Sequence, residues 1–182
     1  MRNPVDVIFE YFYSHGAEQY LGEPVTLREH MLQTARHAEL DGASVELIAA
    51  SLLHDVGHMI HGERDDTTRI GIDLDHEEIG YRFLSSHFPA SVVDPVRLHV
   101  AAKRYLCTVD DSYLDVLSRA SKLSFDLQGG PMSAEEVAAF ESEPFFEAAC
   151  KLRRYDDAAK DPAGETPQLE HYRAVLEAVV ER

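Results

Sequence analysis

The feature that most constrains this chain is a series of helix start and stop signals with almost no strand pattern between them. Thr26 and Glu29 form a T-x-x-E capping box, in which the two side chains satisfy backbone N–H groups at a helix N-terminus. Ser133 and Glu136 form a second box, and Gly42 is placed to end the helix that the first box starts. These signals predict an all-α fold, a bundle of roughly eight helices joined by short connections.

The spacing of apolar residues sets the expected boundaries of these helices. Asp75 and Glu78 form a D-x-x-E box, and Asp94 before Pro95 is a typical N-cap, so each pair is expected to start a helix. Gly57 is expected to end a helix that begins after Ser44. The expected helical ranges are 4–13, 26–40, 45–56, 75–84, 94–106, 110–127, a short helix after 133, 143–160 and 169–180.

The polar stretch over residues 58–75 is expected to form a long loop, because it contains Gly62 and Gly71 and little apolar periodicity. The acidic pair Asp65 and Asp66 within it is interpreted as part of a solvated loop and not as a cluster of ligands. Loops of this length are often functional.

Composition narrows the class of protein. The 182 residues, 45% of them hydrophobic, are enough for one core, so we expect a single domain over residues 1–182. The formal net charge of −16 argues against nucleic acid as a partner, because such proteins carry stripes of Lys and Arg. No apolar stretch reaches the ~18 residues of a membrane span, no signal peptide is evident, and two cysteines are too few for a disulfide framework. We expect a cytoplasmic protein that binds a small ligand, with no membrane and no nucleic-acid partner.

The ten histidines are the feature of composition that stands out. Five of them fall near expected helix ends, where several helices can converge: His30, His54, His58, His76 and His99. Neighbouring residues on a helix project about 100° apart, so His54 can bind one metal ion while the two oxygens of Asp55 bridge to a second. The other five are expected to have no catalytic role: His15, His37, His61, His87 and His171.

A single histidine at a helix end is usually a cap or a solvated side chain, so the joint pattern carries the argument. The order H…HD…H…H…D, completed by Asp156, resembles the HD-domain superfamily of helical metal proteins. The resemblance implies a helical bundle with a dinuclear metal site between helices, in which Asp55 bridges. The implied ligands are His30, His54, Asp55, His76, His99 and Asp156. Asp157 competes with Asp156, which is preferred because it follows the aromatic residue in the R-x-aromatic-D pattern of the family.

Several segments carry a more specific resemblance. The stretches Y-L-G-E at 20–23, E-H-M-L-Q at 29–33, H-V-A-A-K-R-Y-L at 99–106, Q-G-G-P-M at 128–132 and the run 153–160 resemble the mixed-valence diiron oxygenases that cleave the carbon–phosphorus bond of 1-hydroxy-2-aminoethylphosphonate. This resemblance implies two iron ions, Fe(II)/Fe(III), with O2 as co-substrate and a small organophosphonate as substrate. The products would be a carboxylate and phosphate, and the 1-hydroxyl group implies an upstream hydroxylase.

The same resemblance implies roles around the metal ions. Contacts to the phosphonate would come from His58, Lys103, Ser121, Ser124 and Arg153. Tyr20 and Glu23 would belong to a loop that senses the substrate and guards the open iron position, and together with His58 and Lys103 they would be the catalytic residues. The spacing agrees with a phosphonate contact for Lys103, because this residue lies four positions after His99, on the same helix face. The alternative is that Lys103 and Arg153 are surface charges.

The resemblance leaves two possible forms for the amine end of the substrate. A trimethylammonio group, which would give glycine betaine, prefers aromatic faces, whereas a primary amine would give glycine. Residues 59–75 depart from the relative that acts on the primary amine, and aromatic side chains are available. We therefore expect the trimethylated substrate. The candidate aromatic residues are Tyr11, Tyr13, Tyr20, Tyr155 and Phe88.

Two other functions compete with the oxygenase. A metal-dependent HD phosphohydrolase that acts on a nucleotide or small phosphoester would work without O2, with Mn or Co, and without Tyr20 or Glu23. A metal or nucleotide sensor would bind its ligand with no turnover.

Overall fold

The computed structural model describes residues 2–20, 22–60 and 66–181, and over residues 66–74 it describes the backbone alone. The described chain is helical, which confirms the all-α prediction, and its only β-type pairing is an isolated bridge between Gln19 and Thr26. The helices are α1 (Pro4–His15), α2 (Leu27–Leu40), α3 (Val45–Leu53), α4 (Val56–Ile60), α5 (Asp66–Leu84), α6 (Ala90–Val109), α7 (Tyr113–Val116), α8 (Arg119–Leu127), α9 (Ala134–Glu141), α10 (Phe146–Ala158), the 3-10 helix η1 (Leu169–Tyr172) and α11 (Arg173–Val179).

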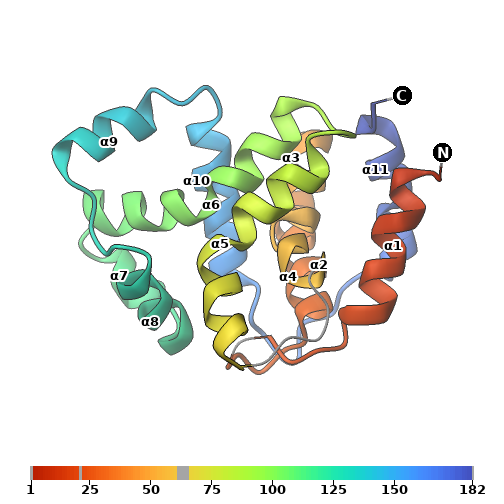
Figure 1. Ribbon diagram of the computed structural model, residues 1–182, viewed down its shortest axis with the longest axis horizontal. Coiled ribbons are helices and arrows are strands. Elements are labelled where there is room, and N and C mark those ends of the chain that lie inside the picture. Colours follow the sequence, from red (N-terminus) through yellow and green to blue (C-terminus); the bar gives the residue numbers. More distant parts are fainter. Residues whose placement is uncertain (1, 21, 61–65, 182) are drawn as a thin grey trace.

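The core lies between α2, α3, α6 and α10, which pack against one another in the middle of the molecule (Figure 1). Leu52 and Leu53 of α3, Val96 of α6 and Leu152 of α10 are completely buried there. Helices α1 and α11 lie on one side of this core, and α7, α8 and α9 lie on the other (Figure 1). The central four helices therefore surround the region in which the predicted ligands lie.

Both capping boxes form as predicted. The N–H of Thr26 donates to Glu29 Oε2 at 2.7 Å while Thr26 Oγ1 accepts from the N–H of Glu29 at 3.3 Å, and Ser133 and Glu136 repeat the arrangement at α9. Gly42 follows α2 with a φ of +68°, a conformation that glycine adopts without strain. The start and stop signals thus fix these ends locally, as expected.

The predicted long loop over residues 58–75 is wrong. Helix α4 continues to Ile60, α5 begins at Asp66, and residues 61–65 lie outside the described part. Asp75 is consequently in the middle of α5, so its predicted capping box with Glu78 is wrong as well. Because α5 is anchored by packing against α4 and α6, extending it backwards adds one hydrogen bond per residue, and this outweighs the roughly 1 kcal/mol that a glycine such as Gly71 costs.

Other boundaries also differ from the prediction. Helix α6 begins at Ala90 and contains Pro95, because burial of Val92 and Val93 in the core favours starting the helix before the proline. The single helix predicted over 110–127 is divided into α7 and α8, where Ser118 caps α8 by accepting from the N–H of Ser121 at 3.0 Å. Local capping therefore overrides the apolar periodicity at this point.

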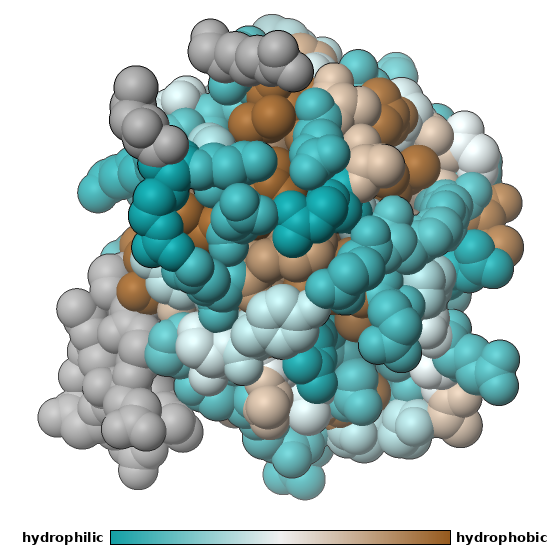
Figure 2. Space-filling view, turned by 90° about the vertical axis from the view of Figure 1, so that its right-hand side faces the viewer, coloured by the Kyte–Doolittle hydropathy of each residue, from teal (hydrophilic) through white to brown (hydrophobic). Residues whose placement is uncertain are grey.

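The surface is mainly polar where α1 and α11 lie. That face shows hydrophilic side chains with smaller hydrophobic areas between them (Figure 2). Among the described residues, no helix combines the length and the apolar character needed to cross a membrane.

Candidate metal centre

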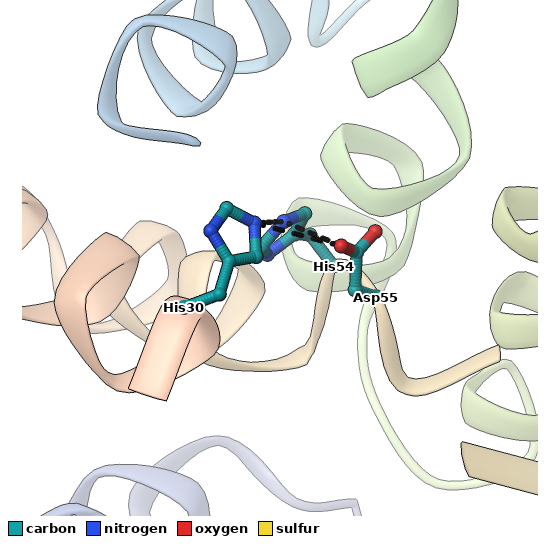
Figure 3. A group of neighbouring side chains, drawn as sticks. All are labelled: His30, His54 and Asp55. Atoms are coloured by element: carbon teal, nitrogen blue, oxygen red, sulfur yellow. Dashed lines mark hydrogen bonds and ion pairs between the residues drawn. The ribbon is translucent and has the colours of Figure 1, made fainter. Parts of the chain in front are cut away.

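The break between α3 and α4 brings the central ligand pair into the core. Helix α3 ends at Leu53, so His54 and Asp55 occupy a turn before α4 begins at Val56. His54 is completely buried and Asp55 is 1% exposed. Figure 3 shows both side chains pointing toward His30 of α2. Two residues adjacent in sequence and one distant residue thus meet at one point.

Hydrogen bonds to the backbone orient three of the imidazole rings. The Nδ1 atoms of His30, His54 and His99 lie 2.8, 2.9 and 2.7 Å from backbone carbonyl oxygens. Because a carbonyl oxygen only accepts, each Nδ1 carries the proton and donates it. When such a ring is neutral, its Nε2 atom presents a lone pair, which is the arrangement that a metal-binding histidine requires.

The ligand atoms form two groups that share one carboxylate. Nε2 of His30 lies 3.1 Å from Nε2 of His54, and Nε2 of His76 lies 3.1 Å from Nε2 of His99. Asp55 stands between the pairs, with Oδ2 3.5 Å from His30 and 3.4 Å from His54, and Oδ1 3.3 Å from His76 and 3.6 Å from His99. Each group, with Asp55, has the mutual spacing of metal ligands.

The chemistry of this cluster fits metal ions. Two lone pairs that face each other at 3.1 Å inside a core repel unless a proton or a cation lies between them. Asp55 Oδ2 and Asp156 Oδ1 are buried and accept no hydrogen bond from the described residues. Leaving such oxygens unpaired is costly. Metal ions held by these atoms would satisfy both conditions, so we conclude that the cluster is built to hold metal.

The ionisation states of the predicted ligands also suit metal binding. Burial alone would raise the pKa of the Asp55 carboxyl, but the imidazoles beside it hold that pKa well below its ordinary value. Burial would also raise the pKa of Asp156, which the guanidinium of Arg153 lowers well below the ordinary range. Burial lowers the pKa of His99 well below its usual value. The carboxylates are therefore ionised and His99 is neutral, the forms that bind a metal ion.

Asp156 and Asp157 lie on different sides of α10. We call His30, His54 and Asp55 the first ligand group, and Asp55, His76 and His99 the second. Asp156 Oδ1 lies 3.4 Å from Nε2 of His30, at the first ligand group. Asp157 instead accepts from the hydroxyl of Tyr113 at 2.9 Å and from Nε of Arg153 at 2.8 Å. The geometry thus brings Asp156, and not Asp157, to the histidines.

A small cavity of about 30 Å³ opens beside the cluster. The predicted site residues that line it are Tyr20, His58, Lys103, Ser121, Ser124 and Arg153, together with Asp55, His76, His99 and Asp156. Glu23 does not line it. Its buried carboxylate accepts from the hydroxyl of Ser118 instead. Val100 and Gln128 also line the cavity, and sequence reasoning missed both, although Gln128 lies in the Q-G-G-P-M segment.

Two buried cations lie against the cavity. Lys103 is 3% exposed and its Nζ donates to Ser124 Oγ at 2.8 Å. Arg153 is 4% exposed and its Nη1 lies 2.8 Å from Asp156 Oδ2. Neither is therefore a surface charge. Burial, followed by the charge of a neighbouring imidazole, lowers the pKa of His58 to about 3, so His58 is neutral at physiological pH.

Tyr20 covers the first ligand group. Its ring stacks on His30, with the centroids 4.1 Å apart and the planes within 13°. Burial raises the pKa of the Tyr20 hydroxyl well above its usual value, and the carboxylates of Asp55 and Asp156 add to this effect. Tyr20 is therefore a neutral phenol beside the metal ligands.

The histidines that were expected to have no catalytic role do not line the cavity, as far as the structure describes them. His171 pairs with Glu39 at 2.8 Å on the surface, and His15 lies 3.5 Å from Glu18. His61 lies outside the described residues.

Comparison with known proteins identifies the family. The model of the HD domain matches residues 27–126, more than half of the chain. The chain belongs to the HD-domain family. The match covers Asp55 and the four histidines of the two ligand groups but ends before α10, so this HD protein adds Asp156 to the cluster from a helix outside the matched range.

The HD protein is also similar to two curated dioxygenases over almost its full length. It is 45% identical to "[1-hydroxy-2-(trimethylamino)ethyl]phosphonate dioxygenase (glycine-betaine-forming)" of Leisingera caerulea, over 99% of this chain and 92% of the relative. It is 42% identical to "Hydroxymethylphosphonate dioxygenase" of Gimesia maris, over 97% and 88%. An uncharacterized protein of Acanthamoeba polyphaga mimivirus is 36% identical over 94% and 80%. The resemblance to phosphonate-cleaving HD oxygenases is thereby confirmed.

Proposed function

We propose that this HD protein is a metal-dependent dioxygenase that cleaves the carbon–phosphorus bond of a 1-hydroxyphosphonate. The observation that carries the proposal is its similarity, over nearly the whole chain, to two dioxygenases named for such substrates. The first substrate that we propose is (R)-1-hydroxy-2-(trimethylammonio)ethylphosphonate, converted to glycine betaine and phosphate. The primary-amine analogue would give glycine and phosphate.

The balance of this reaction requires O2. The C1–P and C1–H bonds break, C1 becomes a carboxylate carbon and phosphorus leaves as phosphate. The two products together contain two more oxygen atoms than the substrate, which O2 supplies while it is fully reduced. A hydrolase would supply water instead and would leave C1 at its original oxidation state.

The metal cofactor that we propose is a pair of iron ions, Fe(II)/Fe(III). Imidazole and carboxylate donors without a thiolate suit iron, as they suit manganese, zinc and cobalt. When bound, the pair would supply the one-electron chemistry of O2 that protein side chains lack. Asp55 would be shared between the two ions, and the proposed ligands are His30, His54, Asp55, His76, His99 and Asp156.

The cations and hydroxyl groups around the cavity would hold the phosphonate. A dianion needs charge-assisted hydrogen bonds when it leaves water. Lys103 and Arg153 would supply the positive charge, in a protein whose net charge is −16. Ser121 would donate from its hydroxyl group, and His58, being neutral, would donate one ring N–H. The hydroxyl of Ser124, which donates to the carbonyl of Ser121 at 3.2 Å, would turn toward the anion. These contacts would fix the orientation of C1 beside the metal ions.

Tyr20 and Glu23 would control access to the first ligand group. The stacking of Tyr20 on His30 would exclude water from this side until a substrate displaces or reorders the ring. Glu23 lies on the same segment, since its N–H donates to the carbonyl of Tyr20 at 2.6 Å. A displacement of Tyr20 would therefore also displace Glu23.

A specific observation favours a second, smaller substrate, hydroxymethylphosphonate. The cavity is small, about 30 Å³, and Tyr20 is the only phenylalanine or tyrosine among the described residues that lines it. Other candidate aromatics lie elsewhere, since Phe88 is in the core and Tyr155 donates to Asp41 at 2.5 Å. Hydroxymethylphosphonate lacks the amine and needs no aromatic surface.

We also propose a cellular setting. The 1-hydroxyl group must be installed by an upstream hydroxylase before this enzyme acts, if the substrate is an ethylphosphonate. Cys107 and Cys150 are free thiols, which supports a reducing, cytoplasmic location.

The experiment that tests the function measures phosphate release by iron-loaded protein, with and without O2. The substrates are the trimethylated compound, its primary-amine analogue and hydroxymethylphosphonate. Release that depends on O2 is expected for at least one of them, and the ratio of kcat/KM values decides among them. Anaerobic hydrolysis of a simple phosphoester in the presence of Mn²⁺, with no O2-dependent release, would instead identify a phosphohydrolase.

A further inference from the structure

Lys160 is a largely buried cation beside the proposed phosphonate site, and it has no role in the function proposed above. It follows α10, its side chain is only 10% exposed, and its Nζ lies 2.9 Å from Ser121 Oγ. The same Nζ lies 3.4 Å from Asp157 Oδ1 and 3.9 Å from both Glu23 Oε1 and Asp156 Oδ1. One ammonium group thus joins α10, α8 and the segment before α2.

The contact with Ser121 determines the direction of a hydroxyl group. An ammonium has donors and no acceptor, so Lys160 donates and Ser121 Oγ accepts in this hydrogen bond. Among the hydrogen bonds of the described residues, Ser121 Oγ donates none. Ser121 also lines the cavity. Its own O–H therefore remains available to an anion that binds in this cavity.

We propose that Lys160 is a positioning residue for anion recognition in this cavity. It occupies the acceptor side of Ser121, so that the hydroxyl of Ser121 donates to a phosphonate or phosphate oxygen. The positive charge of Lys160 polarises the hydroxyl and strengthens its donation. The inference rests on the proposed function for the identity of the anion, but the hydrogen-bond geometry is independent of it.

Lys160 also balances the charge of the surrounding carboxylates. Asp157 is 1% exposed and holds Arg153 through two hydrogen bonds, one of them at 2.8 Å from Nε. Glu23 is buried and lies within reach of the same ammonium. Removal of Lys160 would therefore affect the fold as well as the anion, and the test must separate the two effects.

The test measures the Kd of inorganic phosphate and of methylphosphonate for the metal-loaded protein by isothermal titration calorimetry. The variants are Lys160→Met, Lys160→Arg, Ser121→Ala and the double variant of Lys160→Met with Ser121→Ala. Lys151→Met is the matched control, because Lys151 is an exposed lysine of α10. Metal content and circular dichroism are recorded for every variant.

Lys160→Met is expected to raise the Kd of phosphate about tenfold, equivalent to about 1.4 kcal/mol, with the metal content unchanged. Lys160→Arg should restore part of the affinity, and Lys151→Met should have no effect. If Lys160 acts through Ser121, the effect of Lys160→Met falls below about twofold in the Ser121→Ala background. Equal effects in both backgrounds, or an unchanged Kd in Lys160→Met, would overturn the proposal.

Ser121→Ala carries the test if Lys160→Met does not fold or loses metal. This variant keeps the ion pairs of Lys160 and removes only the directed hydroxyl, so it must itself weaken phosphate binding at least about fivefold. Unchanged affinity in Ser121→Ala refutes the inference. Because binding is measured without turnover, this result is independent of whether the wild-type protein releases phosphate from a phosphonate.

Discussion

A methyl group at residue 57 would have no room between α4 and α5. The Cβ of an alanine at Gly57 would lie 2.0 Å from the carbonyl oxygen of His76 and 2.8 Å from its carbonyl carbon. Real Cβ atoms essentially never approach closer than 3.0 Å, so the two backbones must separate by about 1 Å. The obstructing atoms belong to the backbone, and no change of rotamer relieves the clash.

The consequences of Gly57→Ala can be worked out from this displacement. Overpacking of this kind costs typically about 1–3 kcal/mol of unfolding free energy. His76 moves with its backbone, and metal–ligand distances tolerate only about 0.2 Å. The second ligand group should therefore lose its ion, while the group of His30, His54 and Asp55 keeps one. We expect the metal content to fall from about two ions per chain to about one.

The assay is metal analysis by mass spectrometry together with urea unfolding. Gly80→Ala is the matched control, because it places a methyl on the facing helix where the nearest atoms, Val56 Cγ1 and Gly57 N, lie at 3.4 and 3.5 Å, which is ordinary contact. That substitution should keep both ions and stabilise the protein by about 0.4–1 kcal/mol. A Gly57→Ala variant with two ions and wild-type stability would refute the reasoning.

Three further outcomes are expected. Asp55→Ala should abolish binding of two ions while the circular dichroism spectrum stays all-α, and a variant that still holds two ions would exclude a shared carboxylate. Lys103→Ala should raise the KM for the phosphonate at least about tenfold, given the roughly 1.5–3 kcal/mol of a hydrogen bond to a charged group, without loss of metal. Loss of metal in this variant would show that Lys103 supports the ligands instead. Removal of metal by a chelator should lower Tm, because an ion at about 100 times its Kd stabilises the fold by about 2.7 kcal/mol, and an unchanged Tm would argue against the cluster as a metal site.

Helix ends that depend on neighbouring side chains could be predicted, whereas those set by distant contacts could not. The box of Thr26 and Glu29 acts within four residues, and it forms as expected. Gly57 was expected to end a helix, but it lies inside α4, where its missing side chain permits the close approach of α5. Nothing in the sequence around Gly57 distinguishes a helix end from a tertiary contact of this kind.

The residues of the site were easier to predict than their arrangement, because ligand chemistry depends on residue type and the arrangement depends on packing. Lys160 illustrates the limit. It was part of a segment that resembled the family, yet its contact with Ser121 joins residues 39 positions apart. The place of Glu23 depends on packing in the same way, since its carboxylate accepts from the hydroxyl of Ser118, 95 positions away.

The turn after α3 contains two neighbouring residues that serve one centre. In the continuous helix expected over residues 45–56, His54 and Asp55 would project about 100° apart. The structure ends α3 at Leu53, and the turn that follows brings Nε2 of His54 to 3.4 Å from Asp55 Oδ2 while Oδ1 reaches His76. The backbone at His54 itself stays helical, with a φ of −57° and a ψ of −35°, so the turn keeps the different directions of the two side chains that let Asp55 reach both ligand groups.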